Sequence, residues 1–426
     1  MLNTSFDSPV LLQKIDISKA GLRTKMLLGD INGDGRMELV MVQADGGIDD
    51  RYVPHQVQCL TAYDLEGTLL WQVGTPDPNA GGPGSDYPAQ IYDWDHDGNN
   101  EILCVMNKRF LVLDGRTGQT KQSFGLPGEH AHDCILIANV SGNSHPQDII
   151  LKDRYRKLWV MDHQFNVLWT HEGNTGHFPW VYDIDGDGHD EVMAGYDLLD
   201  HDGTKLWSCS DLDDHADCIW FGKVDGPASD EVRIVVGGSV TVMYDVRGHE
   251  IWRYEDSIES QHIALGKFRD DLPGLQIAGL DRIVRGDTGG TFSQSGKDGL
   301  FLLDAKGNEV WKEDRQTPGW LTIIETLRHW DRGSLDYILA YRRGGGVHPT
   351  LYDGHMNPVL TFPVDGYTAH ADLTGCGFEH VIIYDADSAY IFGHEKMTLE
   401  ARKPGHSLAQ SKRLYSSTLY PGGEYE

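Results

Sequence analysis

No stretch of this sequence comes close to the roughly 20 consecutive apolar residues that a membrane-spanning helix requires. The first residues, Met1 to Asp7, also lack the basic segment and the apolar core of a secretory signal. Proline is scarce, with 17 residues, and no low-complexity run is present, which argues against long disordered linkers. We therefore expect a cytoplasmic protein without a membrane partner, or a secreted one if a signal has been removed.

The sequence also contains few cysteines and few basic residues. Six cysteines are present, none of them in a Cys-x-x-Cys pair, at Cys59, Cys104, Cys134, Cys209, Cys218 and Cys376. Because most of them lie in apolar, strand-like runs, we expect buried free thiols rather than a disulfide framework. The 36 Lys and Arg residues face 65 Asp and Glu, and the net charge of −29 argues against nucleic acid as a partner. We expect a monomer.

A repeated phrase dominates what the sequence does contain. Three segments place Asp at position 1, Asn or Asp at position 3, Asp at position 5, Gly at position 6 and Glu at position 9. These residues are Asp30, Asn32, Asp34 and Glu38 in the first segment, Asp93, Asp95, Asp97 and Glu101 in the second, and Asp183, Asp185, Asp187 and Glu191 in the third. A second phrase, Asp followed seven residues later by Trp, occurs five times, as in Asp64 and Trp71. Such repetition indicates one supersecondary unit used many times.

The unit is clearest between His177 and Asp211, where four short apolar segments alternate with turn signals. Four such strands form one antiparallel sheet, which cannot bury both of its faces without neighbours. Eight units can be counted, with first strands near residues 24–29, 88–92, 133–138, 178–182, 217–222, 261–266, 320–325 and 367–371. The last unit lacks a clear fourth strand, which the apolar segment Val10 to Ile17 could supply.

We therefore predict an all-β protein, an eight-bladed β-propeller of four-stranded antiparallel blades whose ring is closed by the N-terminal strand. Seven blades are the alternative if the weak unit near residues 320–360 is an insertion. Residues 1–400 would form this single domain, and residues 401–426 would form a C-terminal tail packed on it. The tryptophans of the second phrase are expected to pack between blades.

The alternation of strands sorts the notable residues onto two faces of the ring. Loops after the first strand of each blade share one face, and all three Asp-rich segments fall there. Their carboxylate and amide oxygens surround one point, and the glycine at position 6 permits a sharp turn, which suits Ca²⁺. The spacing resembles the nine-residue calcium loops of integrin-type propeller repeats, and we expect up to three structural Ca²⁺ sites.

The opposite face carries the loops after the second strands and the links between blades, and it collects Arg, His and Tyr. The residues at the starts of blades are His130, His132, His177, His215 and His262, and those after second strands are Arg109, Arg154, Tyr155, Arg156, Tyr196, Arg282 and Arg342. A focused positive patch in a negative body suits a small or linear anionic ligand.

Several of these features together resemble the β-propeller polysaccharide lyases. They are the Asp-Gly loops, the His-led first strands, the Asp-to-Trp turns and the stretch Lys-Asp-Arg-Tyr-Arg-x-Leu-Trp from Lys152 to Trp159. This group includes rhamnogalacturonan, ulvan and rhamnose–glucuronate lyases. The resemblance implies a carbon–oxygen lyase that cleaves a uronic-acid-containing oligosaccharide or polysaccharide by β-elimination.

β-Elimination at a uronic acid requires a base for the proton on C5, an acid for the leaving oxygen on C4 and a cation that neutralises the carboxylate. We predict His132 as the base, Tyr155 or Tyr196 as its acid partner, and Arg154 or Arg156 as the cation. The predicted substrate-binding residues are His130, His177, His215, His262, Arg109, Arg282 and Arg342.

Three other classes of function are compatible with parts of the sequence. A non-catalytic, calcium-stabilised propeller that binds carbohydrate or protein accounts for the blades and the loops without using the Arg, His and Tyr residues. A quinoprotein dehydrogenase shares the turn before the Trp, but this sequence has no adjacent Cys-Cys pair. A hydrolase is disfavoured because no pair of carboxylates stands out on the second face.

Overall fold

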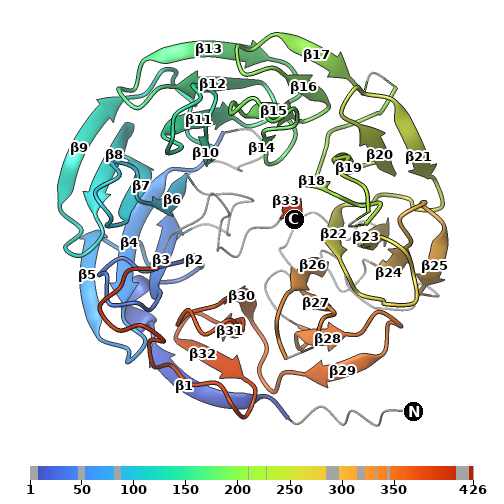
Figure 1. Ribbon diagram of the computed structural model, residues 1–426. Coiled ribbons are helices and arrows are strands. Elements are labelled where there is room, and N and C mark those ends of the chain that lie inside the picture. Colours follow the sequence, from blue (N-terminus) through green and yellow to red (C-terminus); the bar gives the residue numbers. More distant parts are fainter. Residues whose placement is uncertain are drawn as a thin grey trace.

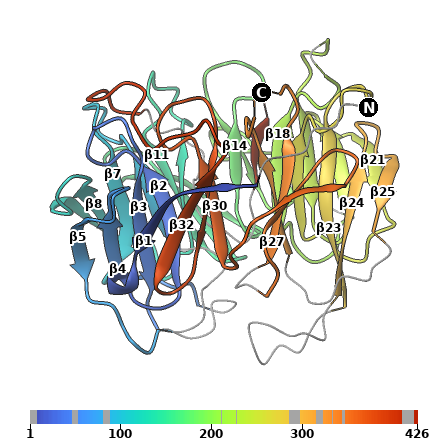
Figure 2. The ribbon, with the colours of Figure 1, turned by 90° about the horizontal axis from the view of Figure 1, so that it is seen from below.

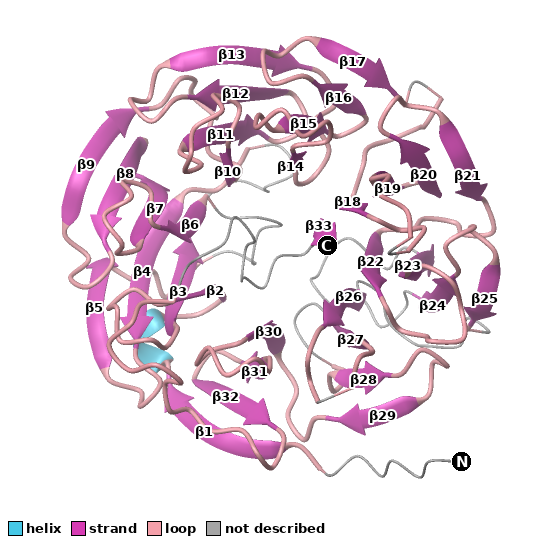
Figure 3. Cartoon of the chain, in the orientation of Figure 1, coloured by secondary structure: helices cyan, strands magenta, loops and turns pink. Residues whose placement is uncertain are grey.

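In the computed structural model of the chain, eight sheets stand side by side in a ring (Figure 1). The structure describes residues 8–46, 53–80, 88–209, 211–226, 228–284, 297–313, 322–331, 333–342, 346–408 and 422–425, without the side chains of 282–284, 297 and 322. The predicted eight-bladed, all-β propeller is confirmed, and the unit near residues 320–360 is a blade of its own. Within these ranges the helical content is one 3-10 helix, η1 (Ser18–Ala20), which Figure 3 shows in cyan.

Blades 1 to 4 each consist of four strands that follow one another along the chain. Blade 1 contains β2 (Thr24–Gly29), β3 (Glu38–Ala44), β4 (Val57–Tyr63) and β5 (Leu69–Gly74). Blade 2 contains β6 (Ala89–Tyr92), β7 (Glu101–Met106), β8 (Arg109–Asp114) and β9 (Thr120–Gly125). Blade 3 contains β10 (Ile135–Ala138), β11 (Asp148–Asp153), β12 (Lys157–Met161) and β13 (Val167–Glu172). Blade 4 contains β14 (Trp180–Tyr182), β15 (Glu191–Ala194), β16 (Asp197–Leu199) and β17 (Lys205–Ser208).

Blades 5 to 8 complete the ring. Blade 5 contains β18 (Cys218–Gly222), β19 (Arg233–Gly237), β20 (Thr241–Asp245) and β21 (Glu250–Tyr254). Blade 6 contains β22 (His262–Gly266), β23 (Gln276–Val284), β24 (Lys297–Leu303) and β25 (Glu309–Lys312). Blade 7 contains β26 (Thr322–Leu327), β27 (Tyr337–Arg342), β28 (Thr350–Tyr352) and β29 (Pro358–Thr361). Blade 8 contains β30 (Tyr367–Ala371), β31 (His380–Tyr384), β32 (Ser388–Gly393) and β1 (Val10–Asp16).

Blade 8 joins the beginning of the chain to its later part. β1 pairs antiparallel with β32, from Val10 opposite Gly393 to Asp16 opposite Ser388, so the predicted closure by the N-terminal strand is confirmed. A last strand, β33 (Gly423–Tyr425), pairs in parallel with the innermost strand β18 and lies near the ring axis in Figure 1. The domain boundary at residue 400 stays a prediction.

The core lies between neighbouring blades. The inner strands β2 and β3 are buried along their whole length, whereas the outermost strand β9 is almost entirely exposed. The tryptophans link blades as predicted: the indole N–H of Trp71 in blade 1 donates to the Gly115 carbonyl of blade 2 at 2.8 Å, and that of Trp169 in blade 3 donates to the His201 carbonyl of blade 4 at 2.7 Å. These hydrogen bonds tie the outermost strand of one blade to the next blade.

The thiols follow the prediction with one difference. All six cysteines are free, and five are buried, whereas Cys376, in the loop between β30 and β31, is only partly buried. Among the described residues, no helix has both the length and the apolar character needed to cross a membrane.

Candidate active site

The two faces of the ring carry different side chains. Successive strands within a blade are antiparallel, so the loops between first and second strands all emerge on one face. The loop between β2 and β3 is an example, and we name this end of the ring the acidic face. The loops between second and third strands, such as the one between β11 and β12, emerge on the opposite face. Figure 2 shows the ring edge-on, with loops at both ends of the strands.

The three Asp-rich loops connect the first and second strands of blades 1, 2 and 4, and they share one backbone design. In the first loop, the Asp30 carboxylate accepts the N–H of Gly35 at 3.0 Å, and the Glu38 carboxylate accepts the N–H of Ile31 at 2.9 Å. The other two loops repeat both contacts. The closing glutamate is therefore held over the same point as the first aspartate in each loop.

The first and third of these loops fit a bound Ca²⁺. Burial raises the pKa of Glu38 to about 8 and that of Glu191 to about 7, because a buried carboxylate is costly unless a positive charge lies beside it. In the third loop, Asp183, Asp185 and Glu191 each present an oxygen within 4.8 Å of the others. Convergent carboxylate oxygens are the ligands that Ca²⁺ prefers.

The second loop differs because it already holds a cation. The ammonium of Lys121 lies 2.5 Å from Oδ2 of Asp95 and 2.8 Å from Oε1 of Glu101. Lys121 is the bulge residue of β9, the fourth strand of blade 2. The equivalent bulge residue is Leu70 in β5 of blade 1 and Leu206 in β17 of blade 4. The donor sets of the three loops are alike, but their surroundings are not.

On the opposite face, three buried charged residues of blade 3 form the base of the candidate site. The ammonium of Lys152 lies 2.6 Å from Oδ2 of Asp133, and Nη1 of Arg154 lies 3.2 Å from Oδ1 of the same carboxylate. Burial alone would raise the pKa of Asp133, but the two cations outweigh it and lower the pKa. Arg154 has φ 41°, an uncommon value for a residue with a side chain, and such conformations concentrate at functional sites.

Tyr155 contacts two histidines, His177 and His215, whose ring centres are 4.8 Å apart. Its hydroxyl is 3.1 Å from Nε2 of His177, and its ring centre is 5.2 Å from that of His177 and 4.6 Å from that of His215. Oδ1 of Asp217 is 3.4 Å from Nε2 of His177 and 3.5 Å from Nε2 of His215. The guanidinium of Arg154 stands 4.9 Å from the centre of the Tyr155 ring. We name these five residues the Tyr155 cluster; they come from blade 3 and from the links into blades 4 and 5.

The two histidines have opposite electrostatic environments. Burial and the nearby Arg154 and His215 keep the pKa of His177 well below its usual range. Burial would also lower the pKa of His215, but the carboxylates of Asp217 and Asp214 outweigh it and raise the pKa. Two imidazoles beside one phenol, with pKa values shifted in opposite directions, are suited to acid–base chemistry in which the two groups take different roles.

His132, the predicted base, lies in a neighbouring group. It is buried, its Nδ1 is 3.4 Å from the His55 carbonyl oxygen, and its ring centre is 6.1 Å from that of His130. Burial lowers the pKa of His132, and His55 pairs with Asp45 at 2.9 Å. The described contacts of His132 therefore join it to blade 1 and not to Tyr155.

The other predicted side chains are spread over the same face. Tyr196 is buried, and its hydroxyl donates to the Asp213 carbonyl at 3.4 Å, close to the link that carries His215. Arg156 is exposed and pairs with Asp153 at 2.7 Å. Arg109 is exposed and donates to the outer strand β9 at 2.6 Å. His262 is buried at the start of β22, and the side chain of Arg282 lies outside the described residues.

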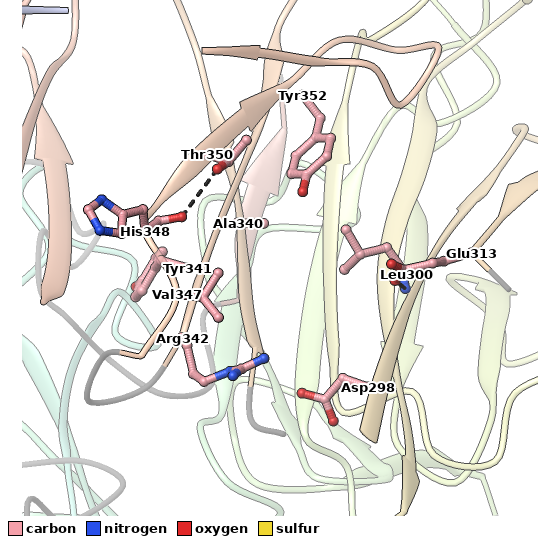
Figure 4. A pocket seen from close by; sticks show the side chains of 10 residues that line it. All are labelled: Asp298, Leu300, Glu313, Ala340, Tyr341, Arg342, Val347, His348, Thr350 and Tyr352. Carbon is pink, nitrogen blue, oxygen red and sulfur yellow. Dashed lines mark hydrogen bonds between the residues drawn. The ribbon is translucent and has the colours of Figure 1, made fainter. Parts of the chain in front are cut away.

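Arg342 lines a separate pocket between blades 6 and 7 (Figure 4). Arg342 and Asp298 lie at one end of this pocket, and Tyr352 and Thr350 lie at the other. The pocket shares no described lining residue with the Tyr155 cluster. It is therefore a candidate for contacts with a distal part of an extended ligand rather than for the acid–base step.

Three members of this arrangement were not predicted from the sequence: Asp133, Lys152 and Asp217. A signal for two of them was present, because the triplet Asp-Cys-Ile begins at both Asp133 and Asp217. Both backbone N–H groups donate to the end of the second strand of their blade, at 2.9 Å and 2.8 Å. Asp133 and Asp217 thus occupy equivalent positions in two blades, and their carboxylates pair with the cations and histidines of the candidate site.

Comparison with known proteins points to one group of enzymes. The chain is 25% identical over 219 residues to the rhamnogalacturonan exolyase YesX of Bacillus subtilis (strain 168), which is 47% of this chain and 32% of that protein. It is 25% identical over 260 residues to the rhamnogalacturonan endolyase YesW of the same organism, which is 46% of this chain and 41% of that protein. The resemblance to β-propeller polysaccharide lyases is confirmed. No protein-family model matches the chain.

Solved structures agree on the fold. The exotype rhamnogalacturonan lyase YesX matches with a TM-score of 0.68 and 18% identity, over 98% of this chain and 80% of that one. The rhamnogalacturonan lyase PL11 of Bacillus licheniformis matches with a TM-score of 0.62 and 16% identity, over 99% of this chain and 80% of that one. The sequence matches span only 32% and 41% of the curated relatives, so the activity of those whole proteins does not transfer directly.

Proposed function

We propose that this protein is a polysaccharide lyase that cleaves a uronic-acid-containing glycan, of the rhamnogalacturonan or rhamnose–glucuronate type, by β-elimination. The observation that carries the proposal is the hydrogen bond of 3.1 Å between the Tyr155 hydroxyl and a histidine, His177, whose pKa is far below its usual range. The sequence similarity to rhamnogalacturonan lyases supports the same class of reaction.

In the proposed reaction, neutral His177 accepts the hydroxyl proton of Tyr155 at Nε2, and the phenolate oxygen takes the proton from C5 of the uronic acid. The electrons of the C5–H bond form the C4=C5 double bond while the C4–O bond breaks. Protonated His215 then gives its proton to the leaving oxygen. This assignment moves the base from His132 to the Tyr155–His177 pair, because the latter two groups are in hydrogen-bond contact.

The positive charge needed to stabilise the developing enediolate comes from the same cluster. Arg154 lies 4.9 Å from the centre of the Tyr155 ring, and Lys152 lies 5.8 Å from it. Both cations are buried, so their field is less screened than it would be at the surface. We propose that they lower the cost of forming the phenolate and hold the substrate carboxylate through this field, while exposed Arg156 contacts the substrate directly.

We also propose that Ca²⁺ binds at the acidic face, in the loops that begin at Asp30 and Asp183. Its role would be structural, because these loops lie on the face opposite the Tyr155 cluster. Ca²⁺ would supply the positive charge that the buried carboxylates of Glu38 and Glu191 require.

One experiment separates the candidate functions. The protein is mixed with fragments of rhamnogalacturonan, ulvan and rhamnose-capped glucuronan, and ultraviolet absorbance and new reducing ends are followed together. A lyase produces both signals, since elimination creates a conjugated double bond, whereas a hydrolase produces reducing ends alone. Binding of a fragment without either signal would contradict the proposal and favour the non-catalytic carbohydrate-binding propeller.

A further inference from the structure

Blade 8 has a loop in the same place as the Asp-rich loops but with different donor atoms. The loop connects β30 to β31, and its positions 1, 3, 5 and 9 are Asp372, Thr374, Cys376 and His380. The corresponding positions of the other loops carry only carboxylates and one amide. The change replaces hard oxygen donors by a thiol and an imidazole.

The backbone of this loop is nevertheless the same. The N–H of Cys376 donates to Oδ1 of Asp372 at 2.9 Å, as the N–H of Asp34 donates to Oδ1 of Asp30 at 3.2 Å. The N–H of Gly377 donates to Oδ2 of Asp372 at 2.6 Å, in the manner of Gly35 in the first loop. The side chains at positions 1 and 5 are thus presented to a common centre although their chemistry differs.

His380 takes the place of the closing glutamate. Its Nδ1 is 3.4 Å from the N–H of Leu373, just as the Glu38 carboxylate receives the N–H of the residue after Asp30. Its Nε2 is 3.3 Å from the Thr398 carbonyl oxygen, which can only accept, so Nε2 carries the proton. The lone pair of Nδ1 then points to the N–H of Leu373, a long contact of 3.4 Å that a metal ion would replace, and a histidine oriented through its other nitrogen by a carbonyl is typical of metal ligands.

The distances within the loop are close to those of a tetrahedral metal site. Sγ of Cys376 is 3.4 Å from Oδ1 of Asp372, and sulfur and oxygen ligands on one zinc ion are about 3.5 Å apart. One donor atom from each of Asp372, Cys376 and His380 lies within 4.8 Å of the others, so a small contraction brings all three to one ion.

A buried hydroxyl lies in the same loop. Thr374 is fully buried, and its Oγ1 has no hydrogen-bond partner among the described residues, although it lies beside the thiol of Cys376. A buried polar atom without a partner is costly, and a water bound to a metal at this point would supply one.

We infer that the loop of blade 8 binds Zn²⁺, or a similarly soft divalent ion, through Asp372 Oδ1, Cys376 Sγ and His380 Nδ1, with a water near Thr374 as the fourth ligand. Thiolate and imidazole donors select such ions, whereas Ca²⁺ takes oxygen donors. Binding would release the thiol proton to solvent. The site would tie the loop to the segment at Thr398, so its role would be structural.

The test uses the full-length protein after removal of metals with a chelator. Titration with Co²⁺ should give one site with visible absorption of tetrahedral geometry and a thiolate-to-metal band, and Zn²⁺ should displace it. Cys376→Ser should weaken Zn²⁺ binding by at least about 100-fold, since losing even an outer-shell partner costs about 10–100-fold. Cys59→Ser, at a buried thiol far from the loop in sequence, is the matched control and should bind as the original protein does.

Two further measurements keep the inference open to refutation if Cys376→Ser does not fold. Cys376 is the one cysteine of the six that is not buried, so it should be labelled first by a thiol reagent, and Zn²⁺ but not Ca²⁺ should protect it. The double variant Cys376→Asp with His380→Glu gives positions 5 and 9 the carboxylates of the Asp-rich loops, with Thr374 kept at position 3, and should exchange Zn²⁺ preference for Ca²⁺ preference. A cobalt complex without a thiolate band, or labelling that Zn²⁺ leaves unchanged, would overturn the inference.

Discussion

The two faces of this propeller use the same eight blades in opposite ways. On the acidic face, the Asp-rich loops of blades 1 and 4 gather carboxylates around a point where positive charge is missing. On the opposite face, the ends of the second strands and the links between blades bring buried cations, imidazoles and a phenol together. The same backbone repeat thus carries a recurring loop motif on one face and a single, non-repeated cluster of side chains on the other.

The two kinds of site depend on the repeat in different ways. An Asp-rich loop can occur in three blades because all of its ligand residues come from a single blade. The Tyr155 cluster needs side chains from three consecutive blade positions, and it can therefore occur once without repetition. Changes in the Tyr155 cluster should therefore lower activity, whereas changes in the Asp-rich loops should lower stability and leave activity unchanged.

Tyr155→Phe is expected to lower activity the most while leaving stability nearly unchanged. Removing the hydroxyl takes away the proposed proton acceptor for C5, and loss of a general acid–base group typically costs 10²–10⁴-fold in rate. The ring contacts with His177 and His215 remain, so the melting temperature should change little. Steady-state rates of double-bond formation check this, with Tyr196→Phe as a matched control that should lose much less. Full activity in Tyr155→Phe would remove the chemical basis of the proposed site.

The pair His177→Gln and His132→Gln tests which histidine serves the reaction. Both side chains are buried, so both variants carry a similar risk to folding, which thermal unfolding will report. We expect His177→Gln to lose about 10²–10⁴-fold in kcat/KM and His132→Gln to lose less than about tenfold. If the larger loss falls on His132→Gln, the assignment made from the sequence is right and the Tyr155–His177 pair is not the base.

The pH dependence follows from the opposite pKa shifts of the two histidines. The rate requires neutral His177, whose lowered pKa places the acid limb well below the ordinary histidine value of about 6.5. It also requires protonated His215, whose raised pKa means that activity falls only as pH rises through a value above that range. Asp214→Asn removes one of the carboxylates that raise this pKa and should move the alkaline limb of kcat/KM to lower pH. An unchanged alkaline limb would exclude His215 as the acid.

Much of the fold could be predicted from the sequence because the repeat restates the same turns and strand lengths. The eight first strands and the closing role of the segment Val10 to Ile17, observed as β1, follow from that pattern alone. The candidate site could be placed on a face but not assembled, because the contact between Tyr155 and His177 spans two blades and depends on the direction of each side chain. Asp133 illustrates the limit: its role becomes visible only once Lys152 and Arg154 are seen to share its carboxylate.

On the acidic face, a calcium chelator should lower the melting temperature by a few degrees. An ion present at 100 times its dissociation constant stabilises the folded state by about 2.7 kcal/mol per site, and this contribution is lost with the ion. Calorimetry with and without chelator measures the loss, and excess Ca²⁺ should restore the transition better than Mg²⁺, which demands stricter geometry. Neither treatment should change the rate of elimination below the unfolding temperature. A melting temperature that the chelator leaves unchanged would contradict the calcium proposal.

The smallest expected effect is that of Lys121→Leu on stability, and it tests whether the loop of blade 2 differs from those of blades 1 and 4. Lys121→Leu gives blade 2 the residue type that blades 1 and 4 have at this bulge, and it removes the ammonium from Asp95 and Glu101. Because Glu101 is buried and Lys121 is partly exposed, we expect a loss of about 1–2 kcal/mol of unfolding free energy in the presence of chelator. Ca²⁺ should recover most of that loss in the variant, since the ion can then take the place of the ammonium. Calcium titrations should accordingly count one more site in Lys121→Leu than in the original protein. If both proteins bind the same number of ions, the lysine is displaced when Ca²⁺ arrives, and all three loops are equivalent after all.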